Sequence, residues 1–146
     1  MTFSADLSAF RDKARGRANL IVRKIVLDVG TRLVLKSPVG DGKYWKSKPP
    51  KGYVGGRFRA NWQYGLDDYS TTTNTNIDAS GQATIAVLTG ATKGVEGGHI
   101  HYITNSLPYS IRLEEGWSYR QAPNGMVALT IEEFKPIVAA AAKALS

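Results

Sequence analysis

Apolar residues near the N-terminus recur with the period of a helix. From Ser4 to about Leu35 they advance by three or four positions, which is the spacing of one helical stripe. The members are Leu7, Phe10, Ala14, Ala18, Ile21, Ile25, Val29 and Leu33. Ser4 is the expected N-cap, and Ser37-Pro38 is the expected stop, because proline disfavours helical geometry in the residue before it. The pattern predicts one long amphipathic helix.

The second half of this helix is apolar over more than one stripe. Further apolar positions there include Leu20, Val22, Val26 and Leu27. Such a helix needs more than one packing partner. Either its own domain buries it on two sides, or another subunit covers a second surface. The sequence leaves both alternatives open, and these four residues are the candidate second interface.

The pattern changes to that of strands between Arg57 and about Leu107. "FRANWQYGL" alternates, "QATIAVLTG" is rich in β-branched residues, and "HIHYITNS" alternates again. The polar run "DDYSTTTNTNIDASG" separates the first two segments. We expect three antiparallel strands in one small sheet.

The C-terminal part predicts a helical turn over 109–115 and a closing helix in "LTIEEFKPIVAAAAKALS". Thr130 and Glu133 fit a capping box, with Leu129 and Phe134 as its hydrophobic staple. Pro136 should kink the helix or delay its regular start. The expected fold class is α+β: a long N-terminal helix and a C-terminal helix pack on a small antiparallel sheet, with a long projecting basic loop. We expect one domain over residues 1–146.

The projecting loop, residues 38–56, is called the arm. It is longer than the loops that compact domains usually leave unstructured. Prolines stiffen its path and glycines supply its turns, so it should extend rather than form a helix. Its expected basic patch is Lys43, Lys46, Lys48 and Lys51, and the expected interface residues in and after it are Tyr44, Trp45, Tyr53, Arg57, Phe58 and Arg59.

Charge gives the arm two possible partners. The net charge of +7 and the interleaving of lysines with aromatic rings fit phosphate neutralisation and base stacking on single-stranded nucleic acid. Tyr, Trp and Arg are also the favoured anchors of protein interfaces. The third interpretation is a basic surface that contacts only solvent.

Length and composition limit the classes of protein to which the chain can belong. The chain of 146 residues is the size of one domain, and without cysteine it has no disulfides or thiolate sites. No apolar run is long enough to span a bilayer, and the N-terminus lacks the order of a secretory signal. We expect a soluble chain, intracellular when made and unprocessed, with no membrane partner.

The sequence contains no complete catalytic or metal-binding pattern. His99 and His101 would share a strand face, with Glu96 and Glu114 as possible further metal ligands, but two histidines make an incomplete site. No serine-nucleophile elbow or phosphate-binding loop is present in the sequence. We expect no enzyme activity and no cofactor.

The order of several short motifs resembles a family. "SPVGDGKYW" followed by "GGRFRANW", then "NSLPYSIRLEEGWS", then "QAPNGMVALTIEEF" is similar to the neck or tail-completion proteins of long-tailed bacteriophages. Matches to the family's first segment are Pro38, Val39, Gly56, Arg57, Phe58, Arg59, Asn61 and Trp62, and those to its second are Tyr109, Leu113, Glu114 and Gly116. The family's usual Asp-Thr before the glycine is missing, and the arm lies between the halves of the first segment.

The resemblance implies a virion structural protein, made in the host cytoplasm, that assembles as a ring at the head-tail junction and completes or attaches the tail. It implies a ring homo-oligomer, sixfold or twelvefold. The implied neighbours are connector or stopper proteins and tail terminator or tail tube proteins, and DNA could pass through the lumen. The alternative is a small basic nucleic-acid-binding module.

Overall fold

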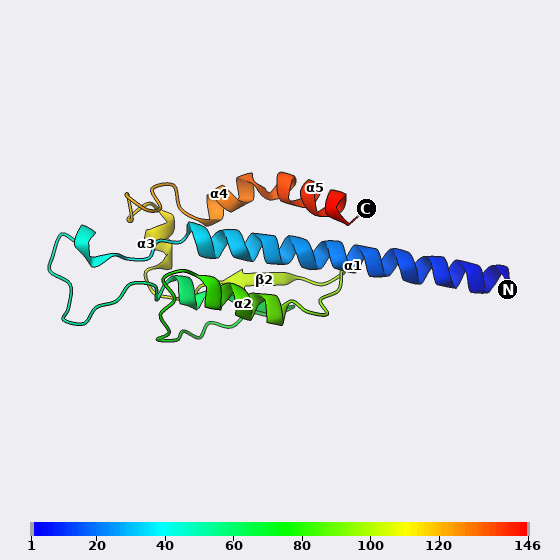
Figure 1. Cartoon of the computed structure of the whole chain (residues 1–146), viewed down its shortest axis with the longest axis horizontal. Helices are drawn as coiled ribbons and strands as arrows, with labels where there is room; N and C mark the ends of the chain where they lie inside the picture. The colour runs from blue at the N-terminus through cyan, green and yellow to red at the C-terminus, as the bar shows by residue number, and fades with distance from the viewer. Residues whose placement is uncertain (1, 146) are drawn as a thin grey trace.

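The computed structural model describes residues 2–145 and has the expected α+β class. The helix α1 (Phe3–Lys36) runs through the length of the molecule, with α4 (Val127–Glu132) and α5 (Phe134–Ala144) along one side (Figure 1). On its other side lie α2 (Gln82–Ala91) and a sheet of β1 (Gln63–Leu66) and β2 (His101–Thr104). The short helix α3 (Ser110–Glu114) lies near the C-terminal end of α1. Thus α1 is a central spine that elements on both sides share.

The long N-terminal helix is confirmed, with a different cap. The hydroxyl of Thr2, not of Ser4, accepts a hydrogen bond from the Ala5 N–H at 3.2 Å. At the other end Ser37 is extended ahead of Pro38, as expected. Its buried hydroxyl donates to the Leu33 carbonyl and accepts a hydrogen bond from the Trp62 indole N–H.

The core forms where the second half of α1 meets the elements around it. Its buried members include Leu33, Val34, Phe58, Trp62, Leu88 and Met126. Gly30 allows α2 to approach α1 closely, because a Cβ there would lie 3.1 Å from the Leu88 side chain. The first half of α1 takes no part in this core and extends beyond the body of the molecule.

The expectation of three strands is wrong. "QATIAVLTG" forms α2 despite its β-branched residues, because it packs on α1 and because the Asp78 carboxylate accepts hydrogen bonds at its N-terminus. The Oδ2 atom of Asp78 accepts hydrogen bonds from both the N–H and the hydroxyl of Thr84, and Oδ1 accepts one from the Gly81 N–H. Within residues 2–145 the sheet has two antiparallel strands, with Gln63 opposite Thr104 and Leu66 opposite His101.

The alternation predicted before β1 is also wrong in part. A single 3-10 turn, η2 (Arg59–Asn61), interrupts it. Phe58 and Trp62 are four residues apart, so this turn directs both rings into the core, where they meet edge to face.

The C-terminal helix breaks near Pro136, as predicted. The break lies at Glu133, and Pro136 occupies the first turn of α5, where its missing N–H costs no helical hydrogen bond. The predicted capping box is wrong, because the Thr130 hydroxyl donates to the Met126 carbonyl within α4. Glu133 instead pairs with Arg32 and Lys36 of α1.

No helix among residues 2–145 combines the length and the apolar content needed to cross a membrane.

Asp78 gives the fold a testable pH dependence. Burial alone would raise its pKa, but the hydrogen bonds from Thr84 and Gly81 outweigh burial and hold the pKa below the ordinary value of 3.8. A carboxylate with a lowered folded-state pKa stabilises the fold above the unfolded value, and this contribution is lost as the pH falls through the folded pKa. We expect Asp78→Asn to lower the free energy of unfolding at pH 7 by on the order of 1 kcal/mol, because an amide nitrogen cannot accept the Oδ2 bonds.

Urea titrations at pH 7 and well below pH 3.8 measure this effect, with Asp68→Asn at an exposed position as the control. The gap between wild type and Asp78→Asn should narrow at the lower pH. A gap of the same size at both pH values would show that the carboxylate does not hold α2.

Candidate functional site

The arm, residues 38–56, leaves the end of α1 and projects from the same end of the molecule (Figure 1). Its base is closed by a hydrogen bond of 2.7 Å from the Gly56 N–H to the Val39 carbonyl. The Tyr53 hydroxyl donates to the Gly40 carbonyl, and the rings of Trp45 and Tyr53 meet with centroids 4.6 Å apart. The arm therefore projects, as predicted, but it is not wholly extended, because a 3-10 turn, η1 (Gly42–Tyr44), lies within it.

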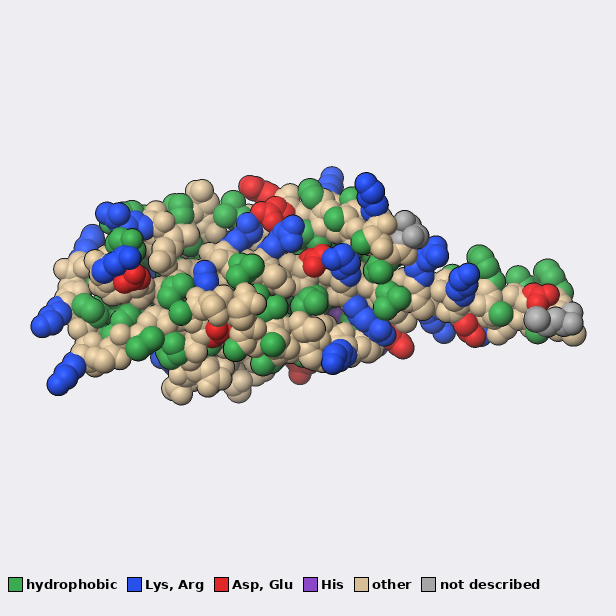
Figure 2. Space-filling model, in the orientation of Figure 1, with side chains coloured by type: hydrophobic (Ala, Val, Ile, Leu, Met, Phe, Trp, Pro, Cys, Tyr) green, Lys and Arg blue, Asp and Glu red, His purple; other side chains and the backbone are tan. Residues whose placement is uncertain are grey.

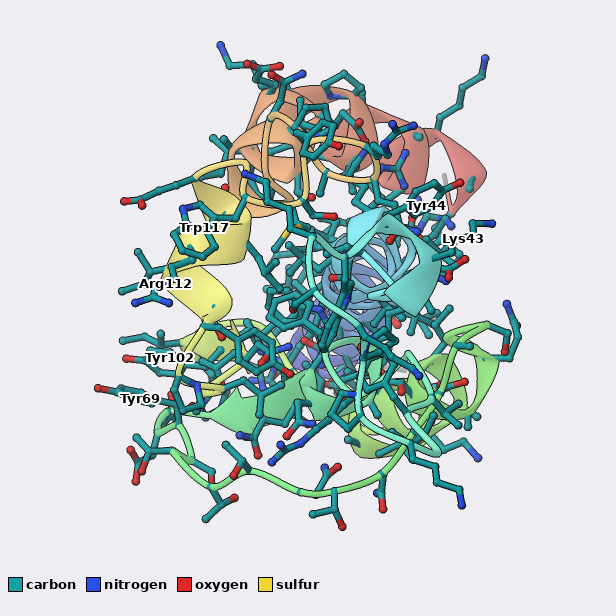
Figure 3. The ribbon with its side chains drawn as sticks, turned by 90° about the vertical axis from the view of Figure 1, so that its left-hand side faces the viewer. Lys43, Tyr44, Tyr69, Tyr102, Arg112 and Trp117 are labelled. Atoms are coloured by element: carbon teal, nitrogen blue, oxygen red, sulfur yellow. The ribbon has the colours of Figure 1, made fainter. Side chains whose placement is uncertain are left out.

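A second loop, residues 117–121, faces the arm. The side-chain oxygen of Gln121 accepts hydrogen bonds from the N–H groups of Val39 and Gly40, which joins the two loops at their bases. Figure 3 looks onto this end of the molecule, with Lys43 and Tyr44 on one side and Arg112 and Trp117 on the other.

Between these loops lies a groove of about 660 Å³. We call it the aromatic groove. Its aromatic lining residues are Tyr44, Trp45, Tyr53, Phe58, Tyr109, Trp117 and Tyr119. This size and a mostly apolar lining are typical of a binding site rather than of ordinary surface.

Cations border the aromatic groove and lie against its rings. The Arg120 guanidinium lies 5.1 Å from the Tyr44 ring centroid and joins the two loops a second time. Arg120 also donates a hydrogen bond to the Tyr119 hydroxyl, which lowers the pKa of Tyr119. On the far side, Arg112 lies over the Trp117 ring at 4.7 Å. These cation–π contacts hold aromatic side chains in place although they are largely exposed.

The predicted basic patch stays on the surface. Lys43, Lys46, Lys48 and Lys51 are all exposed. Lys43 pairs with Asp41 at 3.0 Å, and this contact raises the pKa of Lys43. Figure 2 shows Lys and Arg side chains protruding from this end of the molecule among hydrophobic ones.

The first two residues after the arm lie in different environments, one at the surface and one in the core. Arg57 is exposed, lines the aromatic groove and donates to the Asn74 carbonyl. Phe58 is only 4% exposed and belongs to the core, so the expectation that it meets a partner is corrected.

Arg59 is also accounted for within the domain. Its guanidinium donates to the carbonyls of Ser37, Leu35 and Ala79, at 2.8, 3.0 and 2.7 Å. Two of these carbonyls belong to the last turn of α1 and its C-cap, where no partner within the helix exists. Burial lowers the pKa of Arg59, yet a guanidinium stays charged at neutral pH. Arg59 thus caps α1.

The predicted second interface on α1 is mostly used within the chain. Val26 is buried, Leu27 packs against the core cluster and Val22 is partly buried, so for these residues the alternative of burial within the domain holds. Leu20 remains 48% exposed. The most exposed large apolar side chains of α1 lie earlier, at Phe3, Leu7 and Phe10.

The candidate metal ligands do not converge. Nδ1 of His99 pairs with Asp67 at 2.7 Å, and Nδ1 of His101 lies 2.9 Å from the Tyr64 hydroxyl. Glu114 accepts hydrogen bonds from the N–H groups of residues 126, 127 and 128 and so caps α4. Among residues 2–145 no group of three or more His, Cys, Asp or Glu side chains could hold a metal ion.

Sequence reasoning found one wall of the aromatic groove and missed the other. The sequence patterns assign no role to Trp117, Tyr119 and Arg120, which follow the helical turn predicted over 109–115. The signal was present, because "GWSYRQ" combines aromatic and basic residues in a loop as the arm does.

No family model, no curated protein and no solved structure matches this chain.

Replacing Arg59 by lysine should destabilise the fold more than replacing Arg57 by lysine. We expect Arg59→Lys to lower the free energy of unfolding by about 1–3 kcal/mol, because one ammonium cannot reach three carbonyls in a fixed fork. Arg57→Lys is the matched control, since Arg57 is exposed and makes one hydrogen bond. Urea denaturation measures both. Equal losses would contradict the capping role.

Proposed function

We propose that this chain is a virion structural protein of the neck of a long-tailed bacteriophage. In this proposal it assembles as a ring at the head-tail junction and completes or attaches the tail. Its neighbours are connector or stopper proteins on one side and tail terminator or tail tube proteins on the other. The observation that carries the proposal is an elongated subunit with exposed apolar surfaces at both ends, Phe3, Leu7 and Phe10 at one and the aromatic groove at the other.

Two different apolar surfaces on one chain favour ring assembly. An interface between unlike patches is heterologous, and it generates a closed ring when the rotation between subunits closes. A self-complementary patch would instead stop at a dimer. Each apolar surface is of a kind that usually marks an interaction site.

The residues that carry the family resemblance also support the proposal, because they form the base of the arm and of the aromatic groove. Arg59 caps α1 directly before the arm, and Glu114 caps α4, the helix that follows the second loop. Gly116 directly precedes that loop at φ +90°, and a Cβ there would lie 2.5 Å from the Pro123 carbonyl oxygen. These motif residues position the two loops.

In this role the arm contacts neighbouring subunits or rings. Trp45 and Tyr53 are exposed, preordered by their mutual contact, and suited to anchor an interface. The lysines of the basic patch face acidic partner surfaces or the DNA in the lumen.

A nucleic-acid-binding module is the second candidate, favoured by exposed lysines next to exposed aromatic rings. It requires DNA binding that weakens steeply with salt and is lost when Lys43, Lys46, Lys48 and Lys51 are changed to glutamine. Salt-independent binding would remove this candidate.

Electron microscopy of phage lysates tests the proposed role. When the gene is disabled, we expect filled heads to accumulate beside separate tails. A gene lacking residues 42–54 should not restore joined particles. That variant should still fold, because Val39 and Gly56 are already hydrogen-bonded across the base of the arm.

The matched control restores the gene with the four lysines of the basic patch changed to glutamine, which keeps the aromatic anchors. Normally tailed particles from the disabled gene would overturn the neck role. Normal particles from the arm deletion alone would overturn only the role given to the arm.

A further inference from the structure

The first turns of α1 form an isolated helix with an exposed apolar stripe. Phe3, Leu7 and Phe10 are 78%, 52% and 72% exposed. The first hydrogen bonds that join α1 to a distant part of the chain are at Asn19, which accepts from the Gly97 N–H, and at Arg23, which donates to the Val95 carbonyl. Figure 2 shows this part of α1 as a rod that leaves the body of the molecule, with hydrophobic side chains along it.

The spacing of the stripe is that of a docking helix. Positions 3, 7 and 10 are i, i+4 and i+7, so the three side chains lie on one face of α1. Helices that lay an apolar face into a hydrophobic groove use anchors at this spacing. A helix of about 15 residues is marginal in water without tertiary contacts, so a partner on this face would also stabilise the helix.

The same chain carries a groove that suits this stripe. The aromatic groove is mostly apolar, has a volume of about 660 Å³ and is open at the surface. Arg57 and Arg120 lie at it, and Asp6 lies beside the stripe one turn after Phe3. Asp6 can therefore pair with one of these arginines in the docked complex, a contact that favours one orientation for docking.

The stripe cannot reach the groove of its own chain. The aromatic groove lies beyond the C-terminal end of α1, where Pro38 and Val39 form part of its lining. A helix of 34 residues at about 1.5 Å per residue separates the two surfaces by about 50 Å. An occupant from this chain must come from a second copy.

We propose that Phe3, Leu7 and Phe10 of one copy dock in the aromatic groove of the next copy. The contact joins unlike surfaces, so each subunit gives its helix to one neighbour and receives a helix from the other. This contact would close the ring, and in that respect the inference rests on the proposed function.

Two single variants test the contact from its two sides. Phe10→Glu places a charge in the stripe and should convert the oligomer to a monomer, whereas Ala9→Glu, with the same charge on another helix face, should remain oligomeric. Trp117→Glu should disrupt the groove in the same way, and its control is Ile111→Glu, at an exposed α3 position that does not line the groove. All four positions are exposed, so the domain should fold in each case, which circular dichroism checks. Sedimentation equilibrium gives the masses.

Mixing the two disrupted variants is the decisive measurement. Phe10→Glu keeps an intact groove, and Trp117→Glu keeps an intact stripe, so their mixture should form a one-to-one dimer and stop there. Chains that remain monomeric in the mixture would overturn the inference. So would a wild-type chain that is monomeric, including one that binds phosphatidylcholine vesicles through Phe10 instead.

The inference and the proposed function can fail separately. Normal particles from a disabled gene, together with dimers in the mixture, would overturn the neck role and keep the contact. Separated heads and tails, together with a wild-type oligomer that Phe10→Glu and Trp117→Glu leave intact, would keep the neck role and overturn the contact.

Discussion

The buried C-terminal end of α1 is the point on which the rest of the structure depends. The last carbonyls of a helix have no partners within it, and in a buried position they must find them elsewhere. Arg59 donates to the carbonyls of Leu35 and Ser37 there, and the Ser37 hydroxyl links the Leu33 carbonyl to the Trp62 indole. This network joins the start of the arm to the start of β1, so it sets where both depart from the core.

Side-chain caps organise the other helices in the same way. Asp78 holds the N-terminus of α2, and Glu114 holds that of α4. Glu133 joins the break between α4 and α5 to Arg32 and Lys36 of α1. Irregular segments thereby acquire fixed positions relative to the core. The aromatic groove needs this, because both of its walls are loops.

The molecule is asymmetric along its length. One end is a bare helix with an apolar stripe, the other carries an aromatic groove bordered by cations, and the packed core lies between them. A monomer in water gains nothing from two such surfaces, since each exposes large apolar side chains. An assembly of copies places each surface against a partner. This is the physical basis on which the proposals for ring formation and for the role in the neck depend.

The sequence alone determined the features that depend on neighbours along the chain. The long helix and its end before Pro38, the break near Pro136, the turn at 110–114 and the projecting arm follow from periodicity and from proline and glycine chemistry. Tertiary structure decided the rest. The segment 82–91 is a helix because packing against α1 adds to the local cap from Asp78, and together they outweigh β-branched propensity.

The candidate site divides in the same manner. The exposed interface residues of the arm could be predicted, because they are aromatic and basic residues in a long loop. Phe58 and Arg59 could not be separated from them, because burial and capping depend on carbonyls and side chains more than twenty residues away. The second wall of the groove lies more than sixty residues from the first, and only the folded chain brings the two together.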